Sequence, residues 1–308
     1  MGLDGLLVVD KPTGCTSHDV VARCRRALSE KKVGHGGTLD PDATGVLLLG
    51  VGRATRLLRF LSPLAKTYIG ELVLGTATDT LDASGQVTGT WDMSGVSPAQ
   101  AEAAAAALTG DLQQVPPMVS AVQVGGRRLH QLAREGVEIE RRPRPVTVSV
   151  FEVEPVEPWE VAEPAAGGAG AAGPRYRFQV QCSSGTYVRS LVDDLGRALG
   201  GGAHMSRLRR TAVGPFKVEG AVPLDEVEAS RVAPPADAVS FLDPLRLDAD
   251  GRADASQGRP LDRGRLGATG PGPWAVLDEA GGLVGVYEAA GESQLRAAVI
   301  LQPANAGS

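Results

Sequence analysis

The sequence predicts an α+β protein with a mixed, mostly antiparallel central sheet, flanking helices and a small β-rich module at the C-terminal end. Segments with strand character are separated by helices, without the strict alternation that a parallel βαβ sheet requires. The 308 residues are 43% hydrophobic, which is enough for a sizeable core. The composition shifts towards Pro, Ala and Asp over residues 221–245. We therefore expect a large domain over residues 1–240 and a small second domain over residues 245–308.

The N-terminal part predicts a strand, a helix and a second strand in that order. GLLVVDKP at 5–12 reads as a short strand that Pro12 ends. The next helix is expected to have Ser17 as its N-cap and Asp19 in its first turn. A glycine-rich loop then leads to the apolar strand TGVLLLGVG at 44–52.

The remaining elements follow from turn and cap signals. SPAQAEAAAAALTGD predicts a helix with Ser97 as its cap and Pro98 in its first turn. A second helix is expected just after Gly185. The segment 164–174 contains Ala, Gly and Pro without a charge, and it predicts a flexible loop. Strand patterns are found at residues 66–80, 145–157, 175–185, 274–280 and 283–289.

The charge distribution allows a nucleic-acid partner in spite of the overall balance. The net charge is −5, but residues 1–150 carry 16 Lys and Arg against 15 Asp and Glu. One basic cluster alone is more often a solvated helix face, whereas four in an acidic chain indicate a local basic surface. The four clusters are 23–32, the trio Arg53, Arg56 and Arg59, 126–144, and 207–210.

The compartment is expected to be the cytoplasm. The three cysteines show no CxxC spacing, and the N-terminal residues do not resemble a secretory signal. No apolar run approaches the roughly 20 residues of a membrane-spanning helix.

Asp40 is the candidate nucleophile. It lies in the stretch VGHGGTLDPDATG, where Gly36 and Gly37 permit close approach of a ligand and Pro41 favours an extended Asp40. The ordinary alternative is a turn carboxylate. Other chemistry is poorly supported, since the four histidines lack metal-ligand spacing and no P-loop, GxGxxG or GxSxG motif is present. CSSGTY lacks an obvious histidine partner for a nucleophile.

Seven motifs follow one another over roughly residues 5–216: DKPTGCTSHDVV, GHGGTLDPDATGVLLLGVGRATR, KTYIGELVLGTATDTLDASG, PPMVSAVQVGGRRLHQLAREG, RRPRPV, CSSGTYVRSLVDDLG and GAHMSRLRRTAVGPF. In this order they resemble the motifs of the TruB-type tRNA pseudouridine synthases. The resemblance implies the pseudouridine synthase fold and the isomerisation of uridine 55 in the T-arm of tRNA. It also implies that the enzyme needs no metal and no cofactor.

The resemblance assigns catalytic roles by position. Asp40 matches the aspartate that attacks the nucleotide at ribose C1′ or uracil C6. Tyr68 matches the tyrosine that stacks on the base and helps to remove the C5 proton. Arg189 matches the arginine that pairs with the catalytic aspartate, here Asp40. Tyr187 matches a residue that lies beside the bound base. Asp82 matches an acidic residue that holds Arg189. The ordinary alternatives are that Tyr68 is a structural residue of a sheet, that Arg189 braces its own helix, and that Asp82 is a turn residue.

Four further positions match residues of the substrate site. His35 matches a histidine that takes up the space vacated by the flipped base. Leu208 matches an apolar residue of the base pocket. Lys11 and Pro12 match a pair that supports the site. A polar loop residue and a core leucine are the ordinary alternatives for His35 and Leu208.

The resemblance also implies how RNA is gripped. Residues 126–144 match an insertion that holds the T-loop, and residues 245–308 stand where relatives have a PUA-like domain. The loop 164–174 is longer than the turn expected there, and we expect it to be dispensable. The arginines expected to contact phosphates are Arg127, Arg128, Arg141, Arg142 and Arg144.

The favoured hypothesis is a monomeric, stand-alone enzyme that binds tRNA without an obligate protein partner and without a membrane. The alternatives are the catalytic subunit of a box H/ACA particle, a tRNA-folding chaperone, and a small-molecule hydrolase that uses Asp40. A chaperone role is compatible with the enzyme.

Overall fold

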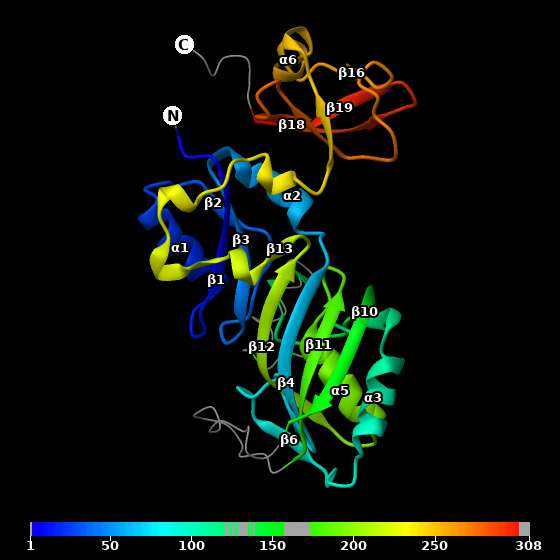
Figure 1. Cartoon of the computed structure of the whole chain (residues 1–308). Helices are drawn as coiled ribbons and strands as arrows, with labels where there is room; N and C mark the ends of the chain where they lie inside the picture. The colour runs from blue at the N-terminus through cyan, green and yellow to red at the C-terminus, as the bar shows by residue number, and fades with distance from the viewer. Residues whose placement is uncertain are drawn as a thin grey trace. The chain divides into compact units, whose positions relative to one another are not determined.

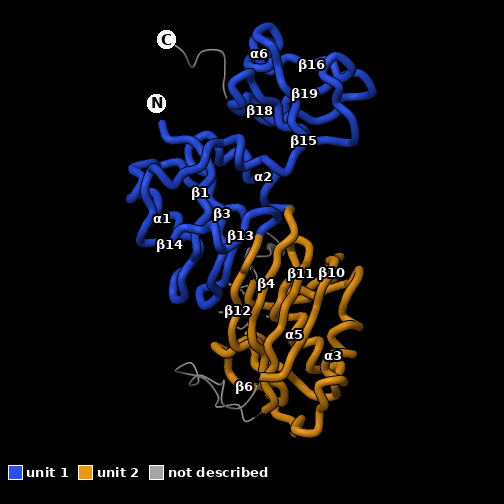
Figure 2. Tube along the Cα trace, in the orientation of Figure 1, with its two compact units in different colours: residues 1–63, 213–308 blue, residues 64–212 orange. Residues whose placement is uncertain are grey.

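The computed structural model of the chain describes residues 2–120, 123–124, 127–128, 135, 137, 139–156 and 173–301. It divides into two compact units (Figure 2). Unit 1 comprises Met1–Pro63 and Val213–Ser308, and unit 2 comprises Leu64–Ala212. Unit 1 is therefore built from both ends of the chain, and unit 2 is one continuous stretch. No helix of the described residues is long and apolar enough to cross a membrane.

The N-terminal part of unit 1 is a small sheet with a helix packed on it. β1 pairs antiparallel with β3 along its whole length, and its other edge pairs parallel with β14, with Val9 opposite Val222. β2 pairs with β3. Side chains of this sheet pack against those of α1 in a core that includes Leu7, Val20 and Leu49. The elements are β1 (Gly5–Lys11), α1 (Ser17–Ala27), β2 (Val33–His35), β3 (Thr44–Val51), η1 (Gly52–Leu57), α2 (Leu58–Leu61), β13 (Phe216–Lys217), η3 (Val218–Gly220), β14 (Val222–Pro223), η4 (Leu224–Glu226), η5 (Ala229–Arg231) and η6 (Asp237–Val239).

The cap of α1 corrects the sequence prediction. Thr16, not Ser17, is the N-cap, and it forms a capping box with Asp19. The Thr16 side chain accepts from the Asp19 N–H at 3.1 Å, and the Asp19 carboxylate accepts from the Thr16 N–H at 2.8 Å. Val20, three residues after Ser17, cannot complete such a box. Ser17 is the first helical residue, and its hydroxyl is left for another partner.

The C-terminal residues fold into a separate five-stranded sheet, as the sequence predicts for a β-rich module. The strand order is β15-β17-β18-β19-β16, and Trp274 and Tyr287 lie at the centre of its own core. The Tyr287 hydroxyl donates to the Ala255 carbonyl of α6 at 3.1 Å, which ties the helix to the sheet. The elements are β15 (Asp243–Arg246), α6 (Ala249–Ser256), β16 (Leu261–Asp262), β17 (Trp274–Leu277), β18 (Leu283–Ala290) and β19 (Gln294–Ile300).

The arginines of one predicted basic cluster hold this module. Arg53 pairs with Asp4 at 2.7 Å and donates to the Leu301 carbonyl at 2.7 Å. Arg56 donates to the Ile300 carbonyl at 2.7 Å, and Arg59 pairs with Glu288 at 3.2 Å. The contacts with Leu301, Ile300 and Glu288 join residues more than 200 positions apart. The cluster was predicted to form part of a basic surface, and the structure gives it a role inside unit 1.

Among the described residues, the main sheet of unit 2 has the strand order β12-β4-β11-β10-β7. β11 alternates buried and exposed residues, so that Phe178 and Val180 lie on its covered face. In β10 a register shift after Val148 moves the buried positions from Val148 to Phe151, and Phe151 then meets Phe178 edge to face. The bounds are β4 (Lys66–Leu74), β5 (Thr76–Thr78), β6 (Val87–Thr90), α3 (Pro98–Ala107), β7 (Gly110–Gln114), β8 (Gln123–Val124), β9 (Arg127–Arg128), β10 (Arg144–Pro155), β11 (Arg175–Cys182), α5 (Val188–Ala198) and β12 (Ala203–Val213).

Two helices, α3 and α5, pack against each other beside this sheet, and α3 contacts β10 (Figure 1). α3 begins as predicted, with Ser97 as the cap and Pro98 in the first turn. Tyr187 is the N-cap residue of α5, and its side chain makes no capping hydrogen bond. The predicted strand 66–80 is divided into β4 and β5 at Gly75, whose φ of +86° favours glycine.

The mixed, mostly antiparallel sheet and the β-rich C-terminal part confirm the predicted fold class. The functional bounds 1–240 and 245–308 stay predictions, as does the PUA-like character of the tail. Residues 164–172 of the predicted flexible loop lie outside the described residues, as do residues 126, 129–134, 136 and 138 of the predicted insertion 126–144.

Candidate active site

The loop that carries Asp40 is anchored to the start of α1. The Ser17 hydroxyl is 1% exposed, accepts from the Leu39 N–H at 2.9 Å and donates to the Leu39 carbonyl at 3.1 Å. Leu39 precedes Asp40, and its own side chain is buried. Asp40 itself is half-buried, and its carbonyl accepts from the Ala43 N–H in a tight turn. The backbone on both sides of the candidate nucleophile is therefore fixed.

Lys11 supports the same loop from β1, and its predicted role in the substrate site stays a prediction. Its ammonium group donates to the carbonyls of Pro12, Pro41 and Ala43 at 2.9, 2.9 and 2.6 Å. The side chain is fully buried. Three carbonyl acceptors use all three ammonium donors, so that Lys11 links β1 to the two residues that flank Asp42.

His35 lies at the end of β2, on the approach to Asp40. Its ring meets the ring of His18 edge to face, with 5.3 Å between the centroids. Its Nδ1 accepts from the Gly37 N–H at 3.4 Å. His18 is exposed on the first turn of α1, and sequence reasoning did not assign it to the site. Both rings lie in unit 1, near the loop that a flipped base is predicted to approach.

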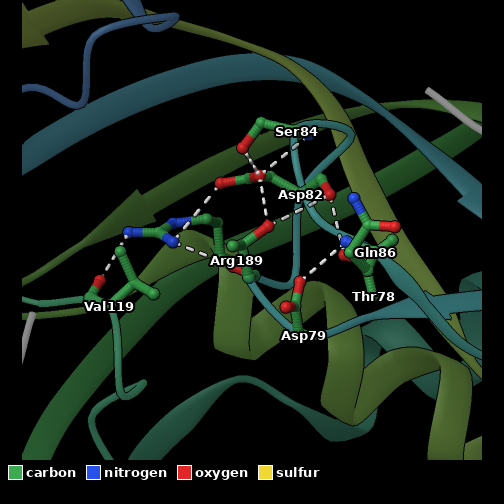
Figure 3. A network of polar contacts seen from close by, with 8 residues as sticks. Thr78, Asp79, Asp82, Ser84, Gln86, Val119 and Arg189 are labelled. Carbon is green, nitrogen blue, oxygen red and sulfur yellow. Dashed lines mark hydrogen bonds and ion pairs between the residues drawn. The ribbon is translucent and has the colours of Figure 1, made fainter. Parts of the chain in front are cut away.

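Asp82 and Arg189 form the ion pair that was predicted for them. The Arg189 Nη1 lies 3.3 Å from the Asp82 Oδ2, and the Arg189 side chain is 5% exposed (Figure 3). Arg189 also donates to the carbonyls of Thr80 and Val119 at 2.9 and 3.0 Å. A carboxylate and two carbonyls therefore fix the plane of the guanidinium within unit 2.

Two hydroxyl side chains orient the carboxylate of Asp82, and sequence reasoning did not identify them. The Asp82 Oδ1 accepts from the Thr80 hydroxyl at 2.6 Å and from the Ser84 hydroxyl and N–H at 2.5 and 3.1 Å (Figure 3). Leu81 between them has a positive φ of 63°, an uncommon conformation for a leucine. The TDTLDASG stretch carries the signal of an Asx turn, and that signal marks Ser84 as a partner of Asp82.

Tyr68, Tyr187 and Leu208 occupy three elements of unit 2. Tyr68 is buried on β4 opposite Val180, Tyr187 is the N-cap residue of α5, and Leu208 is half-buried on β12. Lys66, at the start of β4, donates to the Leu64 carbonyl at 2.6 Å. Its burial, with Arg210 beside it, lowers the pKa of Lys66 to about 8.

The predicted RNA-contacting arginines are described only in part. Arg127 and Arg128 form the short strand β9, and their side chains lie outside what the structure describes. Arg144 is exposed at the first position of β10, and Arg142 is exposed two residues before it. Arg141 is half-buried and donates to the Pro116 carbonyl at 3.1 Å, a contact within the protein.

The structure thus brings Asp82 to Arg189, and Lys11 to the loop of Asp40. Asp40 belongs to unit 1 and Arg189 to unit 2, and their pairing stays a prediction. Among the described residues, no three His, Cys, Asp or Glu side chains gather as ligands for a metal ion would.

Comparison with known families places most of this chain within two related domain models. The N-terminal domain model of the TruB family of pseudouridylate synthases matches residues 25–188. The model of the tRNA pseudouridylate synthase B C-terminal domain matches residues 189–246.

Curated proteins are similar over nearly the whole chain. A tRNA pseudouridine synthase B of Rhodococcus jostii is 46% identical over 304 residues, which cover 97% of this chain and 94% of that protein. The protein of the same name from Streptomyces coelicolor is 46% identical over 291 residues, 92% of this chain and 93% of that protein.

Solved structures support the fold. A chain from the crystal structure of a Cbf5–Nop10–Gar1 complex matches with a TM-score of 0.70 and 28% identity, covering 96% of this chain and 84% of that chain. A chain from an archaeal box H/ACA Nop10–Cbf5 complex matches with a TM-score of 0.70 and 26% identity, covering 98% and 87%.

Proposed function

The chain belongs to the TruB family of pseudouridylate synthases, and we propose that its substrate is uridine 55 in the T-arm of tRNA. The activity is that of a tRNA pseudouridine synthase, an isomerisation of uridine to pseudouridine. The observation that carries the proposal is the fixed guanidinium of Arg189, held by Asp82 and two carbonyls at the positions predicted for the catalytic network.

The proposed mechanism assigns the covalent step to Asp40. Its carboxylate attacks the nucleotide at ribose C1′ or at uracil C6, the bond between C1′ and N1 breaks, and the base rotates. A new bond then forms between C1′ and C5, the bond between the nucleotide and Asp40 breaks to restore the carboxylate, the C5 proton is lost, and N1 takes up a proton, so that the product is an isomer of the substrate. A nearby arginine keeps a carboxylate ionised in a desolvated pocket, and Arg189 is proposed to do so for Asp40.

Tyr68 is proposed to stack on the flipped base and to help remove the C5 proton. Flipping a base out of a folded loop costs a few kcal/mol. Stacking on an aromatic ring contributes about 1–3 kcal/mol, which offsets much of this cost. Leu208 and Tyr187 are proposed to line the base pocket, and His35 to occupy the space that the base leaves.

The enzyme is proposed to act alone, as a monomer in the cytoplasm, without a metal, a cofactor or an obligate protein partner. The identity of 46% to proteins named tRNA pseudouridine synthase B, against 28% to the Cbf5 chain, favours this over the role of a particle subunit. Arg127, Arg128, Arg142 and Arg144 are proposed to contact RNA phosphates. An additional tRNA-folding role is compatible with these contacts.

Tritium release tests the proposal. The protein alone is mixed with a tRNA transcript that carries tritium at uridine C5, because this label is lost only when the base rejoins through C5. We expect release by the wild type, no release by Asp40→Asn, and normal release by the matched variant Asp42→Asn on the same loop. Replacement of uridine 55 by cytidine should remove the signal. Release that persists with Asp40→Asn overturns the assigned nucleophile, and no release by folded wild type overturns the proposed substrate.

A further inference from the structure

Gln114, the last residue of β7, binds the backbone of Tyr187 with both ends of its side-chain amide. Its Nε2 donates to the Tyr187 carbonyl at 3.0 Å, and its Oε1 accepts from the Tyr187 N–H at 2.7 Å. The side chain is 4% exposed, although glutamine is a residue that usually lies at the surface. The two residues are 73 positions apart, so that this contact exists only in the folded protein.

The contact is made at the residue where α5 begins. The Tyr187 carbonyl also accepts the first hydrogen bond of the helix, from Leu191 at 3.2 Å. The Tyr187 side chain makes no capping bond. A helix whose N-cap residue lacks such a bond depends on other groups to fix its first turn. Gln114 supplies two of those bonds, and Arg189 lies in that first turn.

The chain that follows Gln114 also holds the end of the Arg189 side chain. The Val119 carbonyl, five residues after Gln114, accepts from the Arg189 Nη2 at 3.0 Å. The backbone of Arg189 is therefore fixed through Tyr187 by Gln114, and its guanidinium is fixed by Val119 and Asp82. One short segment of unit 2 acts on both ends of the same arginine.

We propose that Gln114 is a positioning residue of the isomerisation, which sets Tyr187 and Arg189 in place through the N-terminal turn of α5. The inference rests on the proposed function, because it takes Arg189 as part of the catalytic network. Gln114 acts through the backbone of Tyr187 and does not itself reach the substrate.

The chemistry of the contact explains why the residue is glutamine. A peptide group offers one donor and one acceptor side by side, and a side-chain amide offers the complementary pair. An ionised glutamate has two acceptors, so that one of its oxygens would face the Tyr187 carbonyl. A methionine has the length of glutamine but leaves the Tyr187 N–H without the Gln114 acceptor, and the Tyr187 carbonyl then keeps only the bond from the Leu191 N–H. Gln113, the preceding residue of β7, is exposed and provides a matched control.

The experiment measures single-turnover isomerisation of tRNA with enzyme in excess, together with the Kd for tRNA. For Gln114→Met we expect the rate constant to fall about tenfold or more, as for a misplaced catalytic group, with the Kd nearly unchanged. Circular dichroism confirms that the variant is folded. Gln113→Met should behave as the wild type.

Gln114→Glu provides a second readout that a purely space-filling role would not give. A neutral carboxyl has an O–H donor and a C=O acceptor, so that it restores both bonds, and burial raises the pKa of such a carboxyl. Relative to wild type at the same pH, the variant should be slow at about pH 8 and recover towards about pH 6. Gln113→Glu should show no such recovery.

The outcomes separate the two proposals. Wild-type rates for both Gln114 variants across this pH range overturn the positioning role, and so does a slow Gln114→Glu enzyme whose relative rate is independent of pH. A loss confined to the Kd assigns Gln114 to RNA binding instead. A wild-type protein that releases no tritium from tRNA counts against the proposed function itself.

Discussion

The Arg189 guanidinium lies 3.3 Å from the carboxylate of Asp82, and both residues belong to unit 2. The Asp82 Oδ1 is occupied by Thr80 and Ser84, which turns Oδ2 towards the arginine. The carbonyls of Thr80 and Val119 take further N–H groups of the guanidinium. The orientation of the arginine is therefore set before any substrate arrives, as a preorganised electrostatic site requires.

Asp82→Asn should lower the single-turnover rate about 100-fold, the range that a misplaced catalytic group costs. Asparagine retains the size and one acceptor but loses the charge that holds Arg189. Asp79→Asn is the matched control, since Asp79 accepts from the Gln86 N–H at 2.8 Å in the same hairpin (Figure 3). Equal rates for the two variants would show that the ion pair does not contribute to turnover.

Ser17→Ala should lower the free energy of unfolding by about 1–3 kcal/mol, because the buried Leu39 N–H and carbonyl both lose their partner. It should also slow turnover, because Leu39 precedes Asp40. Urea unfolding and single-turnover kinetics measure the two effects. Thr13→Ala is the control, since the Thr13 hydroxyl donates to the Asp42 carbonyl in a long, exposed bond of 3.4 Å. A Ser17→Ala protein as stable and as active as wild type would contradict the anchoring role.

Thiol reagents at about pH 7.5 should modify only Cys15 in the folded protein, because the thiolate is the reactive species. Burial raises the pKa of both Cys24 and Cys182 to about 11, so that both remain protonated at this pH. Cys15 is half-buried. Titration with a chromogenic disulfide should count one thiol before denaturation and three after it. Rapid modification of a second thiol in the native protein would contradict the burial of these groups.

Arg142→Gln and Arg144→Gln should each reduce the slope of log K for tRNA against log salt by about 0.7–0.9, the value for one phosphate contact. Fluorescence titrations at several salt concentrations measure the slope. Arg265→Gln is the control, since Arg265 is paired with Asp248 at 2.8 Å in the C-terminal module. An unchanged slope for the first two variants would remove these arginines from the RNA interface.

Local signals in the sequence predicted most elements correctly, and they also contained the correction at α1. The spacing Thr16-x-x-Asp19 completes a capping box. The residue three positions after Ser17 is Val20, which cannot complete one. Two hydroxyl residues stand next to each other where the helix begins, and only the acidic residue three positions after Thr16 distinguishes them. The strand pattern of β10 likewise reverses at a bulge that no alternation rule locates.

Contacts between distant residues could not be predicted in this way. Arg53 and Arg56 bind backbone carbonyls 248 and 244 residues away, and every residue has such a carbonyl. The same holds for Val119, whose carbonyl reaches Arg189 across 70 positions. Motifs identified Arg189 and Asp82, because their side chains carry the chemistry. Gln114 carries no reactive group, and its burial was visible only in the folded chain.

The pairing of β1 with β14 has a consequence for synthesis on the ribosome. Leu6 exchanges hydrogen bonds with Ala233, and Val9 lies opposite Val222. At a translation rate of about 5–20 residues per second, these partners are synthesised about 10–45 s after β1. All of unit 2 is translated in that interval. An unpaired strand edge is a template for aggregation. The first strand of the nascent chain therefore has an open edge throughout that interval, where a chaperone can protect it.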